Sequence, residues 1–200
     1  SMTVRGRFYF TYPFYPYPDM GIRGAKVVLY DNEPWPMPPE QLREGITSND
    51  GYFEFSGIDD NDGPMENGRD LFVRLVFETE AARIADASSG NAVYTQDTII
   101  MGDVQIPADG IVDFGDIYIG EDYAAWISNE MMTAYEWYSG NTGHVQPQAY
   151  IKHRADETYY DCDDGSINLE ANLGYDTFTL YHESVSYTHL TLPDELDGVD

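Results

Sequence analysis

Residues 47–55 read Thr-Ser-Asn-Asp-Gly-Tyr-Phe-Glu-Phe and carry a strong local signal for a turn and a strand. Asp50 and Gly51 form a dipeptide typical of tight turns, because glycine reaches left-handed backbone angles at no steric cost. After the turn, side chains alternate in character up to Phe55, which is the period of a half-buried strand. The stretch therefore predicts a β-hairpin turn followed by a strand.

Similar short segments with the same period occur on both sides of this turn. They are separated by Asp, Asn, Gly and Pro, and four prolines between residues 34 and 39 force a loop. The predicted strands are Val4–Tyr12, Ile22–Tyr30, Leu71–Phe77, Ala92–Tyr94 and Asp113–Ile119. Seven or so short strands at this spacing predict a mainly-β protein whose residues 1–118 form an immunoglobulin-like or transthyretin-like antiparallel sandwich.

Two segments of this region carry a family resemblance. The residues from Gly24 through Val27 to Asp31, followed by Thr47 to Phe55, resemble the G-x-x-V…T-x-x-x-G-x-F pattern of transthyretin-like domains. That group includes the carboxypeptidase regulatory-like domains and the collagen-adhesin B-type repeats. The resemblance implies a seven-stranded, typically extracellular sandwich in which Gly24 and Gly51 hold turns and Val27 lies in the core.

The second half of the chain has a different pattern. Residues Asp122–Tyr138 place apolar side chains near helical spacing, which predicts an amphipathic helix. Val145–His153 and Tyr159–Leu169 are interpreted as two strands, and Tyr175–Glu183 as the start of a second helix with Asp176 as its N-cap. Residues 119–184 are therefore predicted to form a smaller α+β region.

His182 and Glu183 are the candidate catalytic pair. In the H-E-x-x-H pattern, two histidines four residues apart bind Zn²⁺ on one helix face, and the glutamate activates a zinc-bound water. Here Ser186 stands at the second histidine position, so this chain cannot complete the pattern. The order of helix, strands and His-Glu helix resembles the front of a zincin-like metalloprotease domain, which implies His182 as a zinc ligand and Glu183 as the general base. Zinc is then expected in the intact parent protein and no cofactor in this chain.

The last residues suggest why the pattern stops. Val185–Pro193, with the sequence VSYTHLTLP, resembles the translation of a transposon-type adapter used in sequencing libraries. We therefore interpret residues 185–200 as a non-native or disordered tail on a truncated gene. The alternative is a natural, irregular tail with an incidental His-Glu pair.

Composition excludes several classes of partner. The chain has 36 acidic and 10 basic residues, a net charge of −26, which repels phosphate backbones and anionic lipid. We therefore expect no nucleic-acid binding, and we expect no membrane insertion because the sequence has no run of eighteen apolar residues. Cys162 is the only cysteine, so an internal disulfide is impossible. An acidic, lysine-poor chain fits a secreted or cell-surface protein, a Ca²⁺-rich surface or a salt-adapted organism, and a charge that only keeps the chain in solution explains it as well. No signal peptide is visible before Val4.

Three further groups of residues are candidates for binding. Asp59, Asn61 and Asp62 offer clustered oxygen ligands for Ca²⁺, although a solvated turn between strands is the favoured explanation. His144 and His153 are possible metal ligands by residue type alone, the alternative being surface or hydrogen-bonded histidines. Aromatic residues near the N-terminus suggest either a carbohydrate-stacking platform or ordinary strand packing: Phe8, Tyr9, Phe10, Tyr12, Phe14, Tyr15 and Tyr17.

Two functional hypotheses follow. The first is the N-terminal fragment of an extracellular zinc metallopeptidase with an accessory sandwich, inactive as this chain stands. The second is a non-enzymatic extracellular adhesion or binding module whose partner is a protein, a peptide or a surface glycan. A histidine in place of Ser186 and a later ligand would favour the enzyme.

Overall fold

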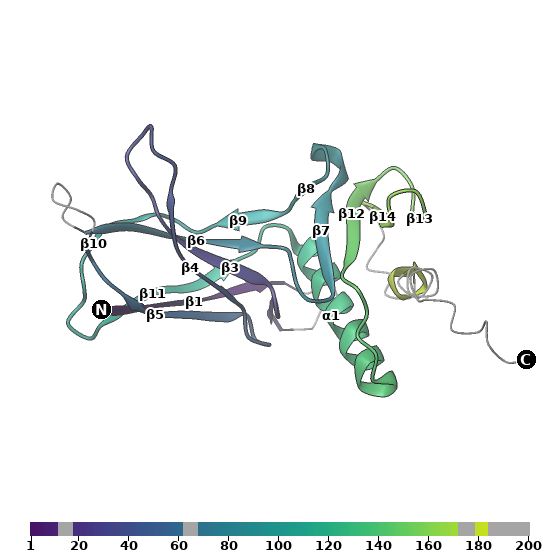
Figure 1. The fold of residues 1–200 in the computed structure, drawn as a ribbon, viewed down its shortest axis with the longest axis horizontal. Coiled ribbons are helices and arrows are strands. Elements are labelled where there is room, and N and C mark those ends of the chain that lie inside the picture. The colour runs from purple at the N-terminus through teal and green to yellow at the C-terminus, as the bar shows by residue number, and fades with distance from the viewer. Residues whose placement is uncertain (12–17, 62–67, 172–178, 184–200) are drawn as a thin grey trace, which may run out of the picture.

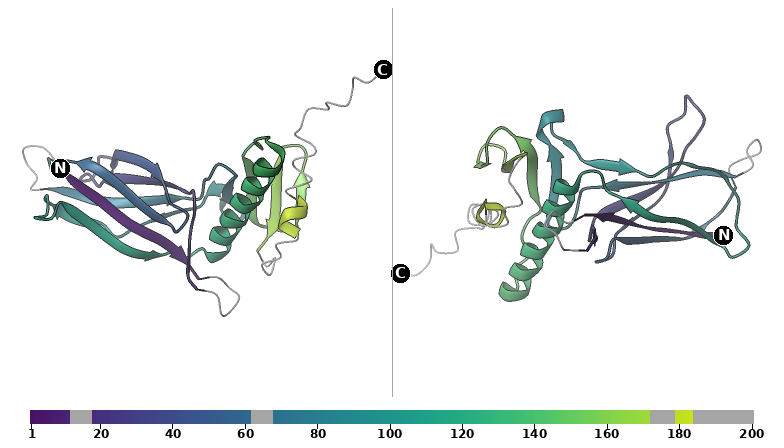
Figure 2. Two further views of the ribbon diagram at one scale, coloured as in Figure 1. Left: turned by 90° about the horizontal axis from the view of Figure 1, so that it is seen from below. Right: turned by 180° about the vertical axis from the view of Figure 1, so that it is seen from behind.

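The structure is a computed structural model that describes residues 1–11, 18–61, 68–171 and 179–183. It is mainly β, with one long helix, which confirms the predicted fold class. Two sheets face each other at one end of an elongated molecule, and the helix and a third sheet lie at the other end (Figure 1; Figure 2). No helix in the described part of the chain is long and apolar enough to cross a membrane.

Sheet A forms one layer of the sandwich. Its strands are β1 (Met2–Phe10), β2 (Met20–Gly21), β5 (Tyr52–Ile58) and β11 (Ile111–Tyr118). The central strand β1 pairs with β11 in parallel and with β2 and β5 in antiparallel orientation. Its side chains alternate between the core, where Phe8 and Phe10 are buried, and the outer face of the sheet.

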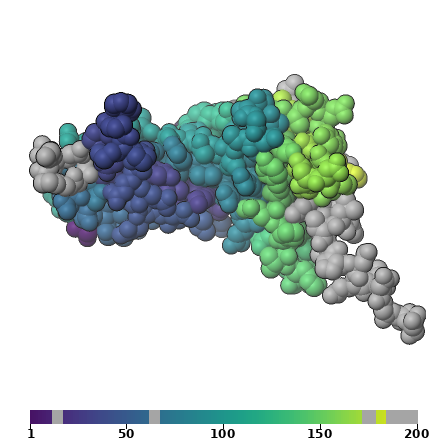
Figure 3. All heavy atoms as spheres, turned by 45° about the horizontal axis from the view of Figure 1, so that its top comes forward, coloured from purple at the N-terminus to yellow at the C-terminus, as the bar shows by residue number. Residues whose placement is uncertain are grey.

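Sheet B forms the second layer and is antiparallel throughout its described strands. These are β3 (Lys26–Asp31), β4 (Glu40–Ile46), β6 (Arg69–Val76), β9 (Thr95–Asp97) and β10 (Met101–Val104). Val27 and Leu29 of β3 are fully buried against sheet A. The loop between β3 and β4 rises from the sandwich as a separate hairpin (Figure 1; Figure 3).

Sheet C takes strands from both halves of the sequence. It contains β7 (Ala82–Asp86), β8 (Ala92–Val93), β12 (Ala149–Ala155), β13 (Tyr159–Asp161) and β14 (Ser166–Glu170). A short 3-10 helix (Ala87–Ser89) joins β7 to β8, and the long helix α1 (Asp122–Thr142) precedes β12. Strand β12 pairs directly with β7, so sheet C contains residues from both sides of the domain boundary predicted at residue 118. The boundary itself stays a prediction.

One continuous core joins the three sheets and the helix. Trp126 of α1, Ile84 of β7, Ile151 of β12 and Leu180 belong to the same buried cluster as the sandwich residue Phe77. Burying this apolar surface is the main favourable term in folding. The helix therefore packs as part of the core and not as an appendage.

The turn at Asp50-Gly51 is present, but the predicted β-hairpin is wrong, because the turn connects β4 of sheet B to β5 of sheet A and these two strands do not pair with each other. Gly51 has a φ of +83°, and a Cβ built on it would lie 2.2 Å from the carbonyl oxygen of Phe8. A side chain at this position would therefore be both strained and in collision with the backbone of β1. The Ser48 amide donates to the Tyr52 carbonyl at 2.8 Å and closes the turn before β5.

Other details differ from the sequence prediction. The segment Tyr159–Leu169, predicted as one strand, is a hairpin of β13 and β14 whose turn contains Gly165 at a φ of +68°. Helix α1 continues through Gly140, one of the two glycines expected to end it, and stops at the other, Gly143, which has a left-handed conformation. The sequence did not predict β2, β4, β7, β9 or β10.

Candidate functional sites

The candidate zinc ligand and base lie on one helical turn. Residues 179–183 are helical, Leu180 is fully buried, and His182 is exposed. The Tyr181 hydroxyl donates to Glu130 Oε2 of α1 at 2.8 Å, which fixes the turn against the long helix. The predicted helix start between residues 175 and 178, and Ser186, lie outside the described residues.

The described residues do not complete a zinc site around His182. Within the described part of the chain, one set of three potential ligands has its ligand atoms within 4.8 Å of one another, and His182 is not in it. His144 is exposed on the segment after α1, whereas His153 is buried in sheet C. The pair His182 and Glu183 therefore stays a prediction that depends on further ligands.

His153 is a hydrogen-bonded core histidine. Its Nδ1 lies 3.1 Å from the Tyr94 hydroxyl, and its side chain is 2% exposed. Burial, with a smaller contribution from the neighbouring Arg154 guanidinium, lowers the pKa of His153 to about 4. It is consequently uncharged at neutral pH, which agrees with the hydrogen-bonded alternative.

The predicted calcium ligands are only partly described. Asp59 Oδ1 accepts a hydrogen bond from Arg69 Nη2 at 2.8 Å and another from the Asn61 amide at 3.3 Å. Hydrogen bonding and charge from Arg69 hold the pKa of Asp59 below its usual range. Asp62 lies outside the described residues. Calcium binding by Asp59 and Asn61 stays a prediction.

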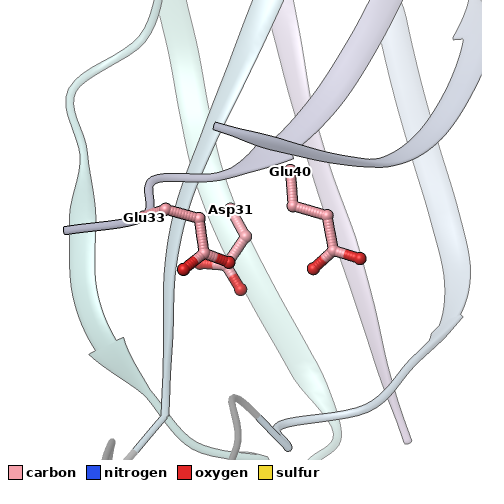
Figure 4. Close-up of side chains that lie close together, drawn as sticks. All are labelled: Asp31, Glu33 and Glu40. Atoms are coloured by element: carbon pink, nitrogen blue, oxygen red, sulfur yellow. The ribbon is translucent and has the colours of Figure 1, made fainter. Parts of the chain in front are cut away.

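An acidic cluster that the sequence analysis missed lies beside Asp59. Asp31, Glu33 and Glu40 form the three-ligand set mentioned above, at the base of the β3–β4 loop (Figure 4). Arg69 Nη1 lies 2.7 Å from the buried Asp31 Oδ2 and 3.5 Å from Glu40 Oε2. The guanidinium therefore already supplies a positive charge where a divalent cation would otherwise be favoured. Burial opposes the charge on Arg69, but hydrogen bonds to Asp59 and Asp31 outweigh it and raise the pKa of Arg69.

A second unpredicted arrangement lies on the outer face of sheet A. We call it the tyrosine–arginine face, and it consists of Arg5, Arg7, Tyr9, Tyr52, Glu54, Asp113 and Asp116. The pairing register of three strands produces this face. Arg5 of β1 is paired with Glu54 of β5 on one side and Asp113 of β11 on the other. Arg7 of β1 is paired in the same way with Tyr52 of β5 and Asp116 of β11.

Arg7 is held at the centre of this face. Its guanidinium lies 5.5 Å from the ring centre of Tyr52 and 5.7 Å from that of Tyr9, which are cation–π distances. Its Nε donates to the Asp50 carbonyl at 2.9 Å, and Nη1 lies 3.9 Å from Asp116 Oδ2. The side chain is 20% exposed, so it is oriented by its contacts but still reaches solvent.

A groove of about 760 Å³ follows this face. A β-bulge at Gly115 shifts the register between β1 and β11, and the φ of Gly115 is +68°. The groove is lined by Arg5, Gly6, Arg7, Ser48, Tyr52, Phe53, Glu54, Asp113, Gly115 and Asp116. Tyr52 is 55% exposed, which leaves its ring available for contact with a ligand. Phe8 and Phe10 of the predicted aromatic platform instead lie in the core, and Tyr9 alone of the described ones joins this face.

Neither protein-family models nor curated protein sequences match this chain. Among solved structures, a 9R-lipoxygenase from Cyanothece PCC8801 is similar over 59% of this chain, with 16% identity and a TM-score of 0.38. This chain spans 16% of the length of that enzyme.

Two smaller proteins are similar over nearly the same share of the chain. The major plantain pollen allergen Pla l 1 has 15% identity over 58% of this chain and 90% of its own, with a TM-score of 0.32. A Pseudomonas aeruginosa protein, described as a proposed carbohydrate-binding protein, has 15% identity over 57% of this chain and 87% of its own, with a TM-score of 0.26.

Proposed function

We propose that this chain is the N-terminal portion of an extracellular zinc metallopeptidase. The portion includes an accessory β-sandwich, and the 200-residue chain by itself is inactive. One observation carries the proposal: His182 and Glu183 follow each other on a helical turn that Tyr181 fixes to α1. Leu180 on the same turn is buried in the core that α1 shares with sheet C. A zinc-binding helix needs this kind of rigid support to hold its ligands in place.

In the proposed enzyme, His182 is the first zinc ligand and Glu183 the general base. Bound zinc would lower the pKa of a coordinated water and supply a nucleophile at neutral pH. Glu183 would accept the proton from that water, and α1 would fix the direction from which both side chains approach. Because Ser186 offers no imidazole, we expect the 200-residue chain to show no chelator-sensitive peptidase activity.

Sequencing the source locus across codon 186 and several hundred bases beyond tests this proposal. A histidine codon at 186 and a later codon for His, Glu or Asp would support the enzyme. Confirmation of Ser186 and of the residues that follow it would remove the proposal. Peptidase activity of the present chain that a chelator abolishes would contradict the expected inactivity.

The alternative is a non-enzymatic binding module. The groove along the tyrosine–arginine face favours it, because that face combines an exposed ring with oriented charged groups. The two roles do not exclude each other, since an accessory sandwich can bind a partner for an attached enzyme. Replacement of groove residues tests the binding role without any change near His182.

A further inference from the structure

We infer that the tyrosine–arginine face binds a neutral glycan. The inference rests on the binding role proposed for the sandwich and is independent of the peptidase proposal. The groove runs over the central strand β1 and its neighbours β5 and β11. The backbone of β1 is already paired on both sides, so a ligand here must be recognised by side chains.

The exposed ring of Tyr52 provides a stacking surface. Arg7 packs between Tyr52 and Tyr9, at 5.5 and 5.7 Å from their ring centres, and this contact restricts the orientation of both rings. A fixed, exposed tyrosine offers a large contact area at a low entropic cost. The apolar C–H face of a sugar ring packs well on such a surface.

The charged groups around Tyr52 supply both donors and acceptors. Arg5 and Arg7 donate, while Glu54, Asp113 and Asp116 accept. The Gly115 amide, and then the Arg5 guanidinium, hold the pKa of Asp113 below its usual range, so its carboxylate stays ionised. Sugar hydroxyls both donate and accept hydrogen bonds, which matches this mixture.

The charges and the lining of the groove disfavour anionic polymers and apolar peptides. The carboxylates Glu54, Asp113 and Asp116 outnumber the two arginines, so an anionic polymer would be repelled. Besides the Tyr52 ring, the described lining of the groove has one large apolar side chain, Phe53, and Phe53 is only 3% exposed, so the groove offers no accessible apolar pocket for a peptide anchor. A neutral polyol ring is therefore favoured over a polyanion or an apolar peptide.

Titration of the full chain with neutral hexasaccharides tests the inference. The probes are cellohexaose, xylohexaose, chitohexaose and mannohexaose, each measured by calorimetry at 0.15 M salt. We expect at least one to bind, and Tyr52→Ala and Arg7→Gln each to weaken that binding about tenfold or more. Tyr159→Ala is the matched control, because Tyr159 is 46% exposed on β13, outside sheet A, and should leave binding unchanged.

Thermal unfolding of each variant separates loss of binding from loss of fold, and Glu54→Gln provides a second groove variant if Arg7→Gln does not fold. Absence of binding to all four sugars, or equal binding by wild type and Tyr52→Ala, overturns the inference. A displayed peptide library that enriches on the wild type but not on Tyr52→Ala also overturns it, but leaves the binding role of the sandwich in place. Failure of the peptidase proposal would leave every one of these results unchanged.

Discussion

Arg69 is the cation that pairs with the carboxylates of Asp31, Glu40 and Asp59. Its side chain is 11% exposed, and it pairs with Asp31, which is 1% exposed. We expect Arg69→Met to lower the free energy of unfolding by about 3–5 kcal/mol, because it leaves a buried carboxylate without its cation. Denaturant unfolding followed by circular dichroism measures this change.

The control for Arg69 is Arg74, whose side chain is 37% exposed and pairs with Asp97 at 2.7 Å. Arg74→Met should cost less, about 1–2 kcal/mol, because its ion pair is half-exposed and what is lost is a modest ion pair and the contacts of the guanidinium with the Tyr30 and Phe72 rings at 5.3 and 5.8 Å. Adding Asp31→Asn to Arg69→Met should restore part of the loss, because the amide oxygen can still accept from the Asp70 amide. Equal effects of the two single arginine variants would contradict this account of the cluster.

His153 should make stability depend on pH in a defined window. Burial first, and then the charge of Arg154, lower its pKa from 6.5 to about 4 in the folded state. As the pH falls from about 6.5 to about 4, the unfolded chain takes up a proton that the folded protein does not, so the folded state loses stability. The 2.5-unit shift corresponds to a loss of about 3 kcal/mol across this window.

The variant His153→Gln isolates this contribution. Both proteins share the same carboxylates, so the difference between their unfolding free energies, measured from pH 7 to pH 4, reports His153 alone. We expect the variant to lose less stability than the wild type as the pH is lowered. Parallel pH profiles would show that His153 does not titrate differently in the folded and unfolded states.

Asn129 connects α1 to the sandwich through two side-chain hydrogen bonds. Its side chain is 5% exposed, its Nδ2 donates to the Gly21 carbonyl at 2.9 Å, and its Oδ1 accepts from the Arg23 amide at 3.0 Å. Asn129→Ala leaves both backbone groups without this partner, and we expect a loss of about 2–4 kcal/mol in unfolding free energy.

Asn141 provides the control on the same helix. It is exposed, and its Nδ2 donates within α1 to the Trp137 carbonyl at 2.6 Å. Asn141→Ala should change the unfolding free energy by about 0.5 kcal/mol or less, as is usual for surface substitutions. A similar loss for Asn129→Ala and Asn141→Ala would mean that the helix is not held by its contact with the link between β2 and β3.

The elements that could be predicted from sequence are those with a strong period. Helix α1 and strand β5 with its preceding turn were predicted because their apolar spacing and turn residues are local signals, whereas the partner of β5 is the distant strand β1 and not the strand before the turn. Strand β4 was missed because it lies at a sheet edge, where most of its side chains are exposed and do not alternate. Strand β7 was missed because Ala82–Asp86 is short, and its partner β12 begins at Ala149.

The candidate sites also differ in whether a local sequence pattern encodes them. His182 and Glu183 could be found from a motif, since their significance depends on adjacent positions. The tyrosine–arginine face could not, because Tyr52, Arg7 and Asp116 come together only through the pairing register of three strands. Arg69 and Asp31 likewise meet through the pairing of β3 with β6, which no local pattern encodes.

The core shared by the three sheets and α1 predicts a single unfolding transition. Sheet C joins β7 to β12, and Trp126 of α1 is buried in the same cluster as Phe77 of the sandwich. Neither half can open without exposing apolar surface of the other, so we expect both to unfold together.

A chain with one tryptophan makes this expectation measurable. Trp35 and Trp137 are 93% and 68% exposed, so replacing both with Phe should leave the fold intact and make Trp126 the sole fluorescent reporter of α1. Strand content of the three sheets is followed by far-ultraviolet circular dichroism in the same urea titration. We expect coincident midpoints, because removing α1 would expose Ile84 and Ile151 to water. A fluorescence midpoint at lower urea would mean that the region after residue 118 unfolds first and that the two predicted domains are thermodynamically separate.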